Sequence, residues 1–270
     1  MAKIGVGVVG LGRIFEDNHL PQISACPDME LVAVADVTES RRARWQNSIN
    51  VPVYDDMQAI LADDEIQLVL ILTPSRFHHS HVLAALRAGK HVMVEKPMAC
   101  SISECEKMVA IAREHNARLV VNNPRRYHVV YQWLREQILS GIWGDPQCIW
   151  MQCRGIGLGC IGTHSFDLPR FLTNREIREV TAWVDNPLGD NPRGTQFIDP
   201  GGLVVLNMEG GLKAVVSQIE NGSGPRFFEI NMNRARIHID EKLGKFEIVC
   251  RNNNKSVSYT HLTLPTNREV

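Results

Sequence analysis

The sequence predicts an α/β protein: a doubly wound parallel sheet at the N-terminus, followed by an α+β domain with a mostly antiparallel, open sheet. In the first 122 residues, continuous apolar runs alternate with helical patterns, as buried parallel strands and their crossover helices should. Beyond residue 123, one amphipathic helix precedes short strand patterns with reverse-turn signals between them. We therefore expect domains at residues 1–122 and 123–255, with residues 256–270 set apart as a tail.

The N-terminal part is expected to contain five strands and five helices. The strands are Ile4–Val9, Glu30–Ala35, Gln67–Leu72, His91–Glu95 and Arg118–Val121, and the helices are Arg13–Cys26, Ser40–Ser48, Met57–Ala62, Phe77–Ala88 and Ile102–His115. Ser101 and Glu104 form a capping box, while Gly89 and Asn116 are suited to end helices in the left-handed conformation. Pro21 should break or kink the first helix. Because parallel strands need right-handed crossovers, this order predicts a doubly wound sheet.

The second part opens with a helix at Val129–Leu139, a turn, and a strand at Cys148–Arg154. A glycine-rich loop and a helical stretch at Ser165–Leu172 follow. The remaining strands are expected at Val180–Val184, Leu203–Met208, Lys213–Ile219, Phe227–Met232, Arg236–Ile239 and Lys245–Val249. Turn signals at Gly210-Gly211, Asn221-Gly222 and Leu243-Gly244 separate them, which favours antiparallel pairing.

The final segment, residues 256–270, reads SVSYTHLTLPTNREV and does not continue the strand pattern well. Its last part resembles a string found at the ends of unrelated predicted reading frames. We therefore interpret it as a non-native tail, in which case the native protein is longer. The alternative is an ordinary final strand at Val257–Leu264.

The composition excludes several classes of protein. There are 29 Lys and Arg against 30 Asp and Glu, a formal charge of −1, so no basic surface for nucleic acid or anionic lipid is indicated. No apolar run approaches the length of about 20 residues that a membrane helix needs, and the start resembles no signal peptide. The seven cysteines include no CxxC pair, so we expect free thiols and a cytoplasmic protein.

A glycine turn follows the first expected strand and opens the first expected helix. Its residues are Gly10, Leu11, Gly12, Arg13 and Ile14. In a Rossmann unit the first glycine allows the tight turn, and the second lets the backbone approach a pyrophosphate that rests on the helix N-terminus. The third position of this fingerprint normally holds a small residue, and here it is Phe15. The alternative is a pair of glycines that serves only as a turn.

Asp36 ends the second expected strand, about 24 residues after the turn. An acidic side chain there can accept both hydroxyls of the adenosine ribose, which favours NAD and disfavours the additional phosphate of NADP. Arg41 and Arg42 lie near enough in the sequence to weaken this preference. We therefore expect NAD as the cofactor, with NADP as the alternative.

Two later segments carry a family resemblance. Residues 73–78 read TPSRFH, and residues 85–97 read ALRAGKHVMVEKP. They resemble the Gfo/Idh/MocA family of sugar and cyclitol dehydrogenases, which typically reads TPNxxH and then ALxAGKHVxxEKP. The resemblance extends from about residue 3 to residue 250 and is strongest up to residue 127. It implies a set of residues near the nicotinamide, namely Thr73, Pro74, His78, Glu95 and Lys96.

By this resemblance Lys96 is the catalytic lysine, and Glu95 and Pro97 set its backbone. Its position supports that role, because it follows an apolar strand at the sheet edge where open α/β sheets bind ligands. Partial desolvation beside a cationic nicotinamide favours the uncharged amine, which suits Lys96 to moving a proton. The Lys96–Pro97 bond is a candidate cis peptide. The alternative for an isolated Lys-Pro pair is a surface turn.

The family also carries a DxGxHxxD pattern that opens a helix and presents an acid and a histidine to the substrate. Gly162, His164 and Asp167 match it, but Cys160 stands where the family has its first aspartate. A thiol cannot accept a hydroxyl hydrogen bond as a carboxylate does, so substrate orientation or histidine basicity is altered. By the resemblance, Cys160, His164 and Asp167 face the substrate. His164 is the candidate general base, and Asp167, three positions on, can orient it.

Two other interpretations of His164 exist. It can be a buried histidine in a helix-capping turn, or a metal ligand together with Cys153 and Cys160. That spacing fits no familiar zinc pattern and hydride transfer to a nicotinamide needs no metal, so we expect no metal site. The segment after the last Rossmann strand adds Arg126, which best matches the family's substrate-side arginine, and Tyr127 as a weaker candidate. A solvated linker is the alternative for that segment.

The resemblance implies an NAD-dependent dehydrogenase that oxidises a secondary hydroxyl of a sugar, amino sugar or cyclitol by hydride transfer. One alternative is a relative that uses NAD transiently for glycoside cleavage or elimination. Another is a catalytically inactive, NAD-binding regulatory paralogue, which Cys160 and Phe15 suggest. The resemblance also implies a homo-oligomer that pairs through the open face of the second sheet.

Overall fold

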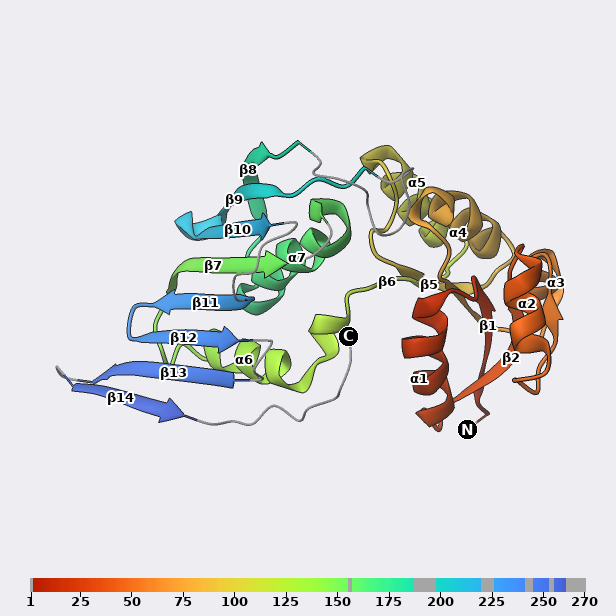
Figure 1. The fold of residues 1–270 in the computed structure, drawn as a ribbon, viewed down its shortest axis with the longest axis horizontal. Helices are drawn as coiled ribbons and strands as arrows, with labels where there is room; N and C mark the ends of the chain where they lie inside the picture. Colours follow the sequence, from red (N-terminus) through yellow and green to blue (C-terminus); the bar gives the residue numbers. More distant parts are fainter. Residues whose placement is uncertain are drawn as a thin grey trace. The chain divides into compact units, whose positions relative to one another are not determined.

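The computed structural model describes residues 2–154, 157–186, 198–219, 226–240, 245–252 and 255–260. The chain forms two compact units, Met1–Asn122 and Asn123–Val270, each with its own sheet (Figure 1). None of the helices in the described ranges has the length and apolar character needed to cross a membrane.

The N-terminal unit is built on a six-stranded parallel sheet with the strand order β3-β2-β1-β4-β5-β6. Its strands are β1 (Ile4–Val9), β2 (Met29–Ala35), β3 (Val53–Tyr54), β4 (Leu68–Ile71), β5 (His91–Glu95) and β6 (Leu119–Asn122). The predicted doubly wound sheet is therefore confirmed. The strand order reverses between β1 and β4, and such sheets bind ligands at this point, outside the carboxyl ends of the strands.

Helices cover both faces of this sheet. They are α1 (Leu20–Ala25), α2 (Glu39–Gln46), α3 (Gln58–Ala62), α4 (His78–Arg87) and α5 (Ile102–Glu114), with a π-helical turn η1 (Phe15–His19) and a 3-10 turn η2 (Ser75–Phe77). Two successive residues of β1 belong to different apolar clusters. Val8 lies in a cluster with residues of α1 and α2, and Val9 lies in a cluster with residues of α3, α4 and α5. Because successive strand residues point to opposite faces, the two clusters are the two cores of the layer structure.

The predicted helix ends are found, but the break at Pro21 is not. Ser101 accepts a hydrogen bond from the Glu104 N–H at 3.3 Å, and Gly89 and Asn116 have positive φ angles of 75° and 51°. Helical structure runs from η1 directly into α1, with Pro21 in the first turn of α1. A proline is tolerated at this position because its missing N–H has little to donate to at a helix start.

The second unit is built on an eight-stranded sheet with the order β14-β13-β12-β11-β7-β10-β9-β8. Its strands are β7 (Pro146–Arg154), β8 (Ile177–Val184), β9 (Gly202–Met208), β10 (Lys213–Ile219), β11 (Phe227–Met232), β12 (Ala235–Asp240), β13 (Lys245–Asn252) and β14 (Lys255–Thr260). Only the β7–β10 pair is parallel among the pairs described. The predicted, mostly antiparallel sheet is confirmed.

Two helices, α6 (Val129–Leu139) and α7 (Gly162–Thr173), pack on one face of this sheet (Figure 1). A 3-10 turn η3 (Pro124–Tyr127) precedes α6, a π-helical turn η4 (Gly157–Ile161) leads into α7, and a 3-10 turn η5 (Glu209–Gly211) joins β9 to β10. The predicted turn signals at residues 221–222 and 243–244 lie outside the described residues. In the tail, β14 pairs with β13, so the alternative final strand is present from Lys255. Residues 261–270 lie outside the described ranges, and a non-native origin of the tail stays a prediction.

Candidate active site

The glycine turn after β1 has the shape that a dinucleotide pyrophosphate requires. Gly10 has φ +104°, and a Cβ atom on it would lie 2.9 Å from the backbone carbon of Leu72, so only glycine fits. A Cβ on Gly12 would meet no atom within 4 Å, so space above its backbone is open. The helical residues that follow present backbone N–H groups, which attract an anion. These residues fit a bound dinucleotide.

Asp36 holds this turn through its side chain. Its Oδ2 atom accepts the Leu11 N–H at 2.8 Å, and its Oδ1 atom accepts the Thr38 N–H at 2.8 Å. Burial raises the pKa of the Asp36 carboxyl, but these backbone hydrogen bonds and the charge of Arg41 outweigh burial and leave the pKa below its ordinary value. Arg41 Nη1 also lies 3.3 Å from Oδ2. Acceptance of the ribose hydroxyls by this carboxylate stays a prediction.

Phe15, at the small-residue position of the fingerprint, lies in the apolar core. Its side chain is fully buried and packs edge-to-face on Trp45 of α2, with ring centroids 5.1 Å apart. It also belongs to the cluster that contains Val8 and Leu72. The π-helical turn that begins at Phe15 widens the helix locally, so the large ring is accommodated away from the glycine turn.

The loops after β4 and β5 are joined by His78. Its ring nitrogens lie 2.8 Å from the Pro97 carbonyl oxygen and 2.7 Å from the Thr73 carbonyl oxygen, and its side chain is almost completely buried. His78 therefore fixes the two loops expected to flank the nicotinamide. Direct contact of its ring with the cofactor stays a prediction. The Lys96–Pro97 peptide bond is cis, as the sequence suggested.

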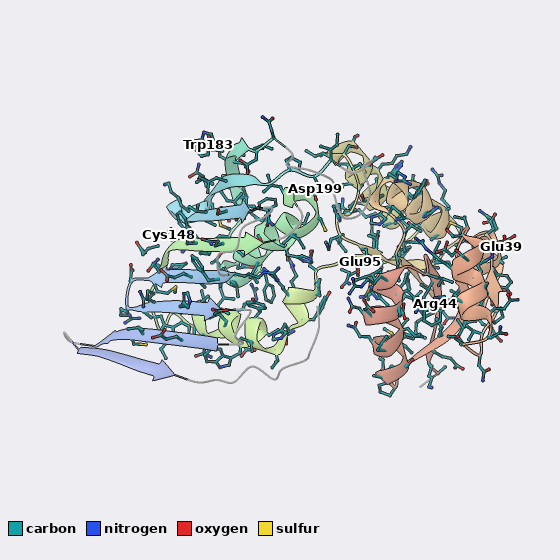
Figure 2. All side chains as sticks on the ribbon, viewed as in Figure 1. Glu39, Arg44, Glu95, Cys148, Trp183 and Asp199 are labelled. Carbon is teal, nitrogen blue, oxygen red and sulfur yellow. The ribbon has the colours of Figure 1, made fainter. Side chains whose placement is uncertain are left out.

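Glu95, the last residue of β5, organises the backbone of Lys96 (Figure 2). Its Oε2 atom accepts the Lys96 N–H at 3.2 Å, and its Oε1 atom contacts His19 Nε2 at 2.8 Å and Asn122 Nδ2 at 2.7 Å. Burial raises the pKa of the Glu95 carboxyl, but the hydrogen bonds from His19 and Asn122, together with the charge interactions with His19 and Lys96, leave the pKa below its ordinary value. Glu95 is thus a buried anion beside the candidate catalytic lysine.

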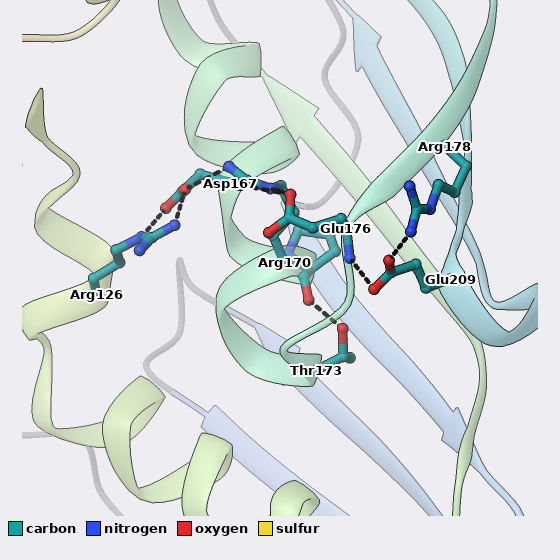
Figure 3. Close-up of polar contacts among 8 residues, drawn as sticks. Arg126, Asp167, Arg170, Thr173, Glu176, Arg178 and Glu209 are labelled. Atoms are coloured by element: carbon teal, nitrogen blue, oxygen red, sulfur yellow. Dashed lines mark hydrogen bonds and ion pairs between the residues drawn. The ribbon is translucent and has the colours of Figure 1, made fainter. Parts of the chain in front are cut away.

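In the second unit, Arg126 and Asp167 bind each other (Figure 3). Arg126 Nε lies 2.7 Å from Asp167 Oδ2, and Nη2 lies 2.5 Å from Oδ1, a bidentate pair. Hydrogen bonding to Asp167 raises the pKa of the Arg126 guanidinium. The pair ties η3 to α7, and Arg170 extends it toward Glu176 of the loop before β8. Tyr127 is exposed at the end of η3.

His164 lies in the first turn of α7, three residues before Asp167, as the helical spacing predicts. Both Asp167 oxygens contact Arg126, so orientation of His164 by Asp167 stays a prediction. Cys160 is buried in η4, and the thiol of Cys153 in β7 lies 3.0 Å from Ser165 Oγ. Within the described ranges, no three His, Cys, Asp or Glu side chains are grouped as metal ligands.

A carboxylate that the sequence did not reveal holds the start of this helical segment. Asp199, which precedes β9 and is labelled in Figure 2, accepts the Gly159 N–H at 2.7 Å and the Cys160 N–H at 2.9 Å. A Cβ on Gly157 would lie 2.3 Å from Asp199 Oδ1, so glycine is needed for this approach. Asp199 and His19 contact the candidate site residues and were not predicted from the sequence. Both make contacts over long sequence separations, and no local pattern marks them.

Comparison with known proteins agrees with this geometry. Residues 4–123 match the family described as "Oxidoreductase family, NAD-binding Rossmann fold" (GFO_IDH_MocA). The D-glucoside 3-dehydrogenase of Escherichia coli K12 is 36% identical over 145 residues, 53% of this chain and 41% of that protein. The myo-inositol 2-dehydrogenase of Thermotoga maritima is 25% identical over 266 residues, 88% of this chain and 79% of that protein.

Similarity of fold extends through both units. The crystal structure of an oxidoreductase domain protein from Kribbella flavida superposes with a TM-score of 0.86 at 22% identity, over 97% of this chain and 81% of that one. The chain spans less than two thirds of the length of several curated relatives, with shares of 66%, 41% and 56%. The N-terminal unit, with its doubly wound parallel sheet and the EKP segment after β5, is therefore similar to the NAD-binding Rossmann-fold domain of the Gfo/Idh/MocA oxidoreductases.

Proposed function

We propose that the protein is an NAD-dependent dehydrogenase that oxidises a secondary hydroxyl of a sugar, amino sugar or cyclitol. The observation that carries this proposal is the placement of Lys96 directly after β5, with its backbone held by the buried Glu95 carboxylate, in the sheet that presents the Gly10–Gly12 turn. The names of the glucoside and inositol dehydrogenases among the relatives support the substrate class.

The cofactor pyrophosphate would be held by the backbone N–H groups that follow Gly12, with Asp36 accepting hydroxyls of the adenosine ribose. When bound, the nicotinamide ring supplies the acceptor for the hydride. NADP is the alternative cofactor, because Arg41 Nη1 lies 3.3 Å from Asp36 Oδ2 and its positive charge reduces the repulsion between Asp36 and the additional phosphate of NADP. Thr73 and Pro74 belong to the loop that His78 fixes, and we propose that they border the nicotinamide.

The chain's own contribution is to hold and move the hydroxyl proton. His164 accepts this proton as general base, and Lys96 donates a hydrogen bond to the same oxygen or shares in the proton transfer. The Arg126–Asp167 pair fixes η3 against α7, so that Tyr127 and His164 keep a constant spacing within the second unit. Such positioning, rather than new redox chemistry, is what a protein adds to a nicotinamide reaction.

The test is a screen of polyols, sugars and cyclitols with NAD and NADP, followed by NADH absorbance. In a substrate found this way, Lys96→Ala should lower turnover by at least about a hundredfold, the size expected for one acid–base group, and leave NADH affinity within about threefold. Lys107, exposed on α5, provides the control, and Lys107→Ala should leave both values unchanged. Normal turnover in Lys96→Ala would refute the assignment.

Two other functions use the same residues. A glycosidase or lyase with transient oxidation would consume substrate without accumulating NADH, so product analysis separates it from a dehydrogenase. A regulatory paralogue would bind NADH tightly and turn over nothing in the screen. Activity gained on Cys160→Asp would count against a purely regulatory role.

We also propose that the second sheet pairs with that of another copy. Strand register places Trp150 of β7 and Trp183 of β8 on the same face, opposite the face on which α6 and α7 pack, and they are 41% and 60% exposed (Figure 2 labels Trp183). Exposed aromatic side chains on one surface are typical of an interface. Sedimentation should show a dimer or tetramer that Trp183→Lys dissociates, while Lys3→Glu should not.

A further inference from the structure

A buried contact joins the helix after the glycine turn to the strand end that carries Lys96. His19, the last residue of η1, places Nε2 2.8 Å from Glu95 Oε1, and the two residues are only 4% and 9% exposed. They are separated by 76 positions in the sequence. No motif of the glycine turn or of the EKP segment includes His19.

The direction of this hydrogen bond follows from the chemistry of Glu95. The pKa of its carboxyl is lowered overall, because the hydrogen bonds from His19 and Asn122 and the charge interactions with His19 and Lys96 together outweigh the upward effect of burial. Glu95 is therefore ionised and can only accept hydrogen bonds. Nε2 of His19 must carry the hydrogen, so His19 is the donor.

The two oxygens of Glu95 divide their partners between the supporting side chains and the lysine. Oε1 receives His19 and Asn122, at 2.8 and 2.7 Å, and Oε2 receives only the Lys96 N–H among the hydrogen bonds described, at 3.2 Å. A carboxylate is rigid and planar, so the position of Oε1 determines the position of Oε2. Losing the His19 donor would leave Asn122 as the sole anchor of Oε1 and would free the carboxylate to rotate.

We propose that His19 is a positioning residue for Lys96, acting through Glu95, and that it couples the helix of the dinucleotide turn to the lysine. The functional part of this inference rests on the proposed role of Lys96 in proton transfer. The positional part does not, because the contacts exist whatever Lys96 does.

The kinetic test uses a pair of substitutions that differ in reach. The amide nitrogen of glutamine can occupy the place of Nε2, whereas the asparagine side chain is too short for its amide nitrogen to reach Glu95. His19→Asn should lower kcat by about tenfold to a hundredfold, the size of a small misplacement of a catalytic group, with KM for the polyol changed by less than about threefold. His19→Gln should keep kcat within about threefold of the wild type.

A control separates positioning from general loss of stability. Met108 is fully buried on α5 in the other apolar cluster, and Met108→Ala should destabilise the same unit without touching the Glu95 contacts. A kcat as low in Met108→Ala as in His19→Asn, at equal loss of melting temperature, would mean that His19 serves only the fold. That result would overturn the inference.

A second measurement needs no substrate. An N-hydroxysuccinimide ester acylates lysines at a rate that depends on the environment of each amine. Mass spectrometry measures this rate for Lys96 with and without NADH, and the exposed Lys107 is the internal reference. His19→Asn should change the Lys96 rate relative to Lys107 by about threefold or more, and His19→Gln should restore it. An unchanged rate in His19→Asn would overturn the inference. A changed rate in a protein that oxidises no polyol would refute the proposed function and leave the positional role of His19 standing.

Discussion

Each unit of the chain uses an aspartate to hold a glycine-bearing turn ahead of a helix, and the two aspartates do so in different settings. Asp36 contacts the Leu11 N–H 25 positions earlier, and Asp199 contacts the Gly159 and Cys160 N–H groups 40 and 39 positions earlier. The first turn leads into the π-helical turn η1, and the N–H groups held by Asp199 belong to the π-helical turn η4 itself. The local device is the same.

The difference lies in what else each carboxylate can reach. Asp36 stands at the carboxyl edge of a parallel sheet and holds the turn whose Gly12 has open space above its backbone. Asp199 lies between two antiparallel strands, β8 and β9, and in the described part of the chain its carboxylate accepts hydrogen bonds from the backbone of η4. The same kind of hydrogen bond therefore supports a helical segment in the second unit, and in the first unit we expect it to shape a ligand-binding turn.

The largest expected effect separates the two aspartates by cofactor affinity. Asp36→Ala removes a charged acceptor that holds the turn and that we expect to bind the ribose. Because each hydrogen bond to a charged group contributes about 1.5–3 kcal/mol, the NADH dissociation constant should rise at least about tenfold. Asp199→Ala should change it by less than about twofold. NADH fluorescence titration measures both. Equal weakening in the two variants would remove the distinction between them.

A smaller effect concerns the stability of the second unit. Asp199→Ala takes away the side chain that satisfies two N–H groups at a helical start, so the free energy of unfolding should fall by about 1–2 kcal/mol. Asp145→Ala is the control, because Asp145 is 76% exposed and its ion pair with Arg175 is at the surface. Hydrogen exchange at residues 157–165 should rise in Asp199→Ala alone. Protection that stays unchanged there would contradict the support role.

The smallest effect is the acid dependence that Asp36 confers. Its pKa is below the ordinary value, so its contribution to stability is complete above about pH 4 and is lost as the pH falls through the lower, folded value. Urea unfolding between pH 5 and about pH 3 should therefore show a shallower decline in Asp36→Asn than in the wild type. Parallel curves would show that Asp36 is not ionised more readily in the folded state.

Features set by local sequence were predictable. The apolar runs predict the strands, and the chemistry of Ser101 predicts the helix cap. The residues that follow β1, β2 and β5 are predicted as candidate site residues because parallel strands end at the same edge of the sheet. Asp36 and Lys96 are such strand-end residues. The two-residue β3 was missed because it is too short to show a period.

Features set by tertiary packing were not predictable. The buried His19–Glu95 contact and the Asp199 contacts depend on which distant segments the fold brings together. The large Phe15 was also unexpected at its position, since a π-helical turn rather than a small side chain makes the room. Pro21 is compatible with a helix because it lies in the first turn of α1, directly after the π-helical turn η1.

The place of β7 in its sheet has a consequence for how the second unit is made during synthesis. β7 is the first strand of that unit to leave the ribosome, yet its two neighbours are β10 and β11, about 60 to 80 residues later. Until β11 emerges, one side of β7 has unpaired backbone groups beneath the helix that carries His164. A nascent chain arrested while β11 is still inside the ribosome should therefore be an efficient client for chaperones that bind unpaired strands, whereas one arrested after β11 has emerged should not.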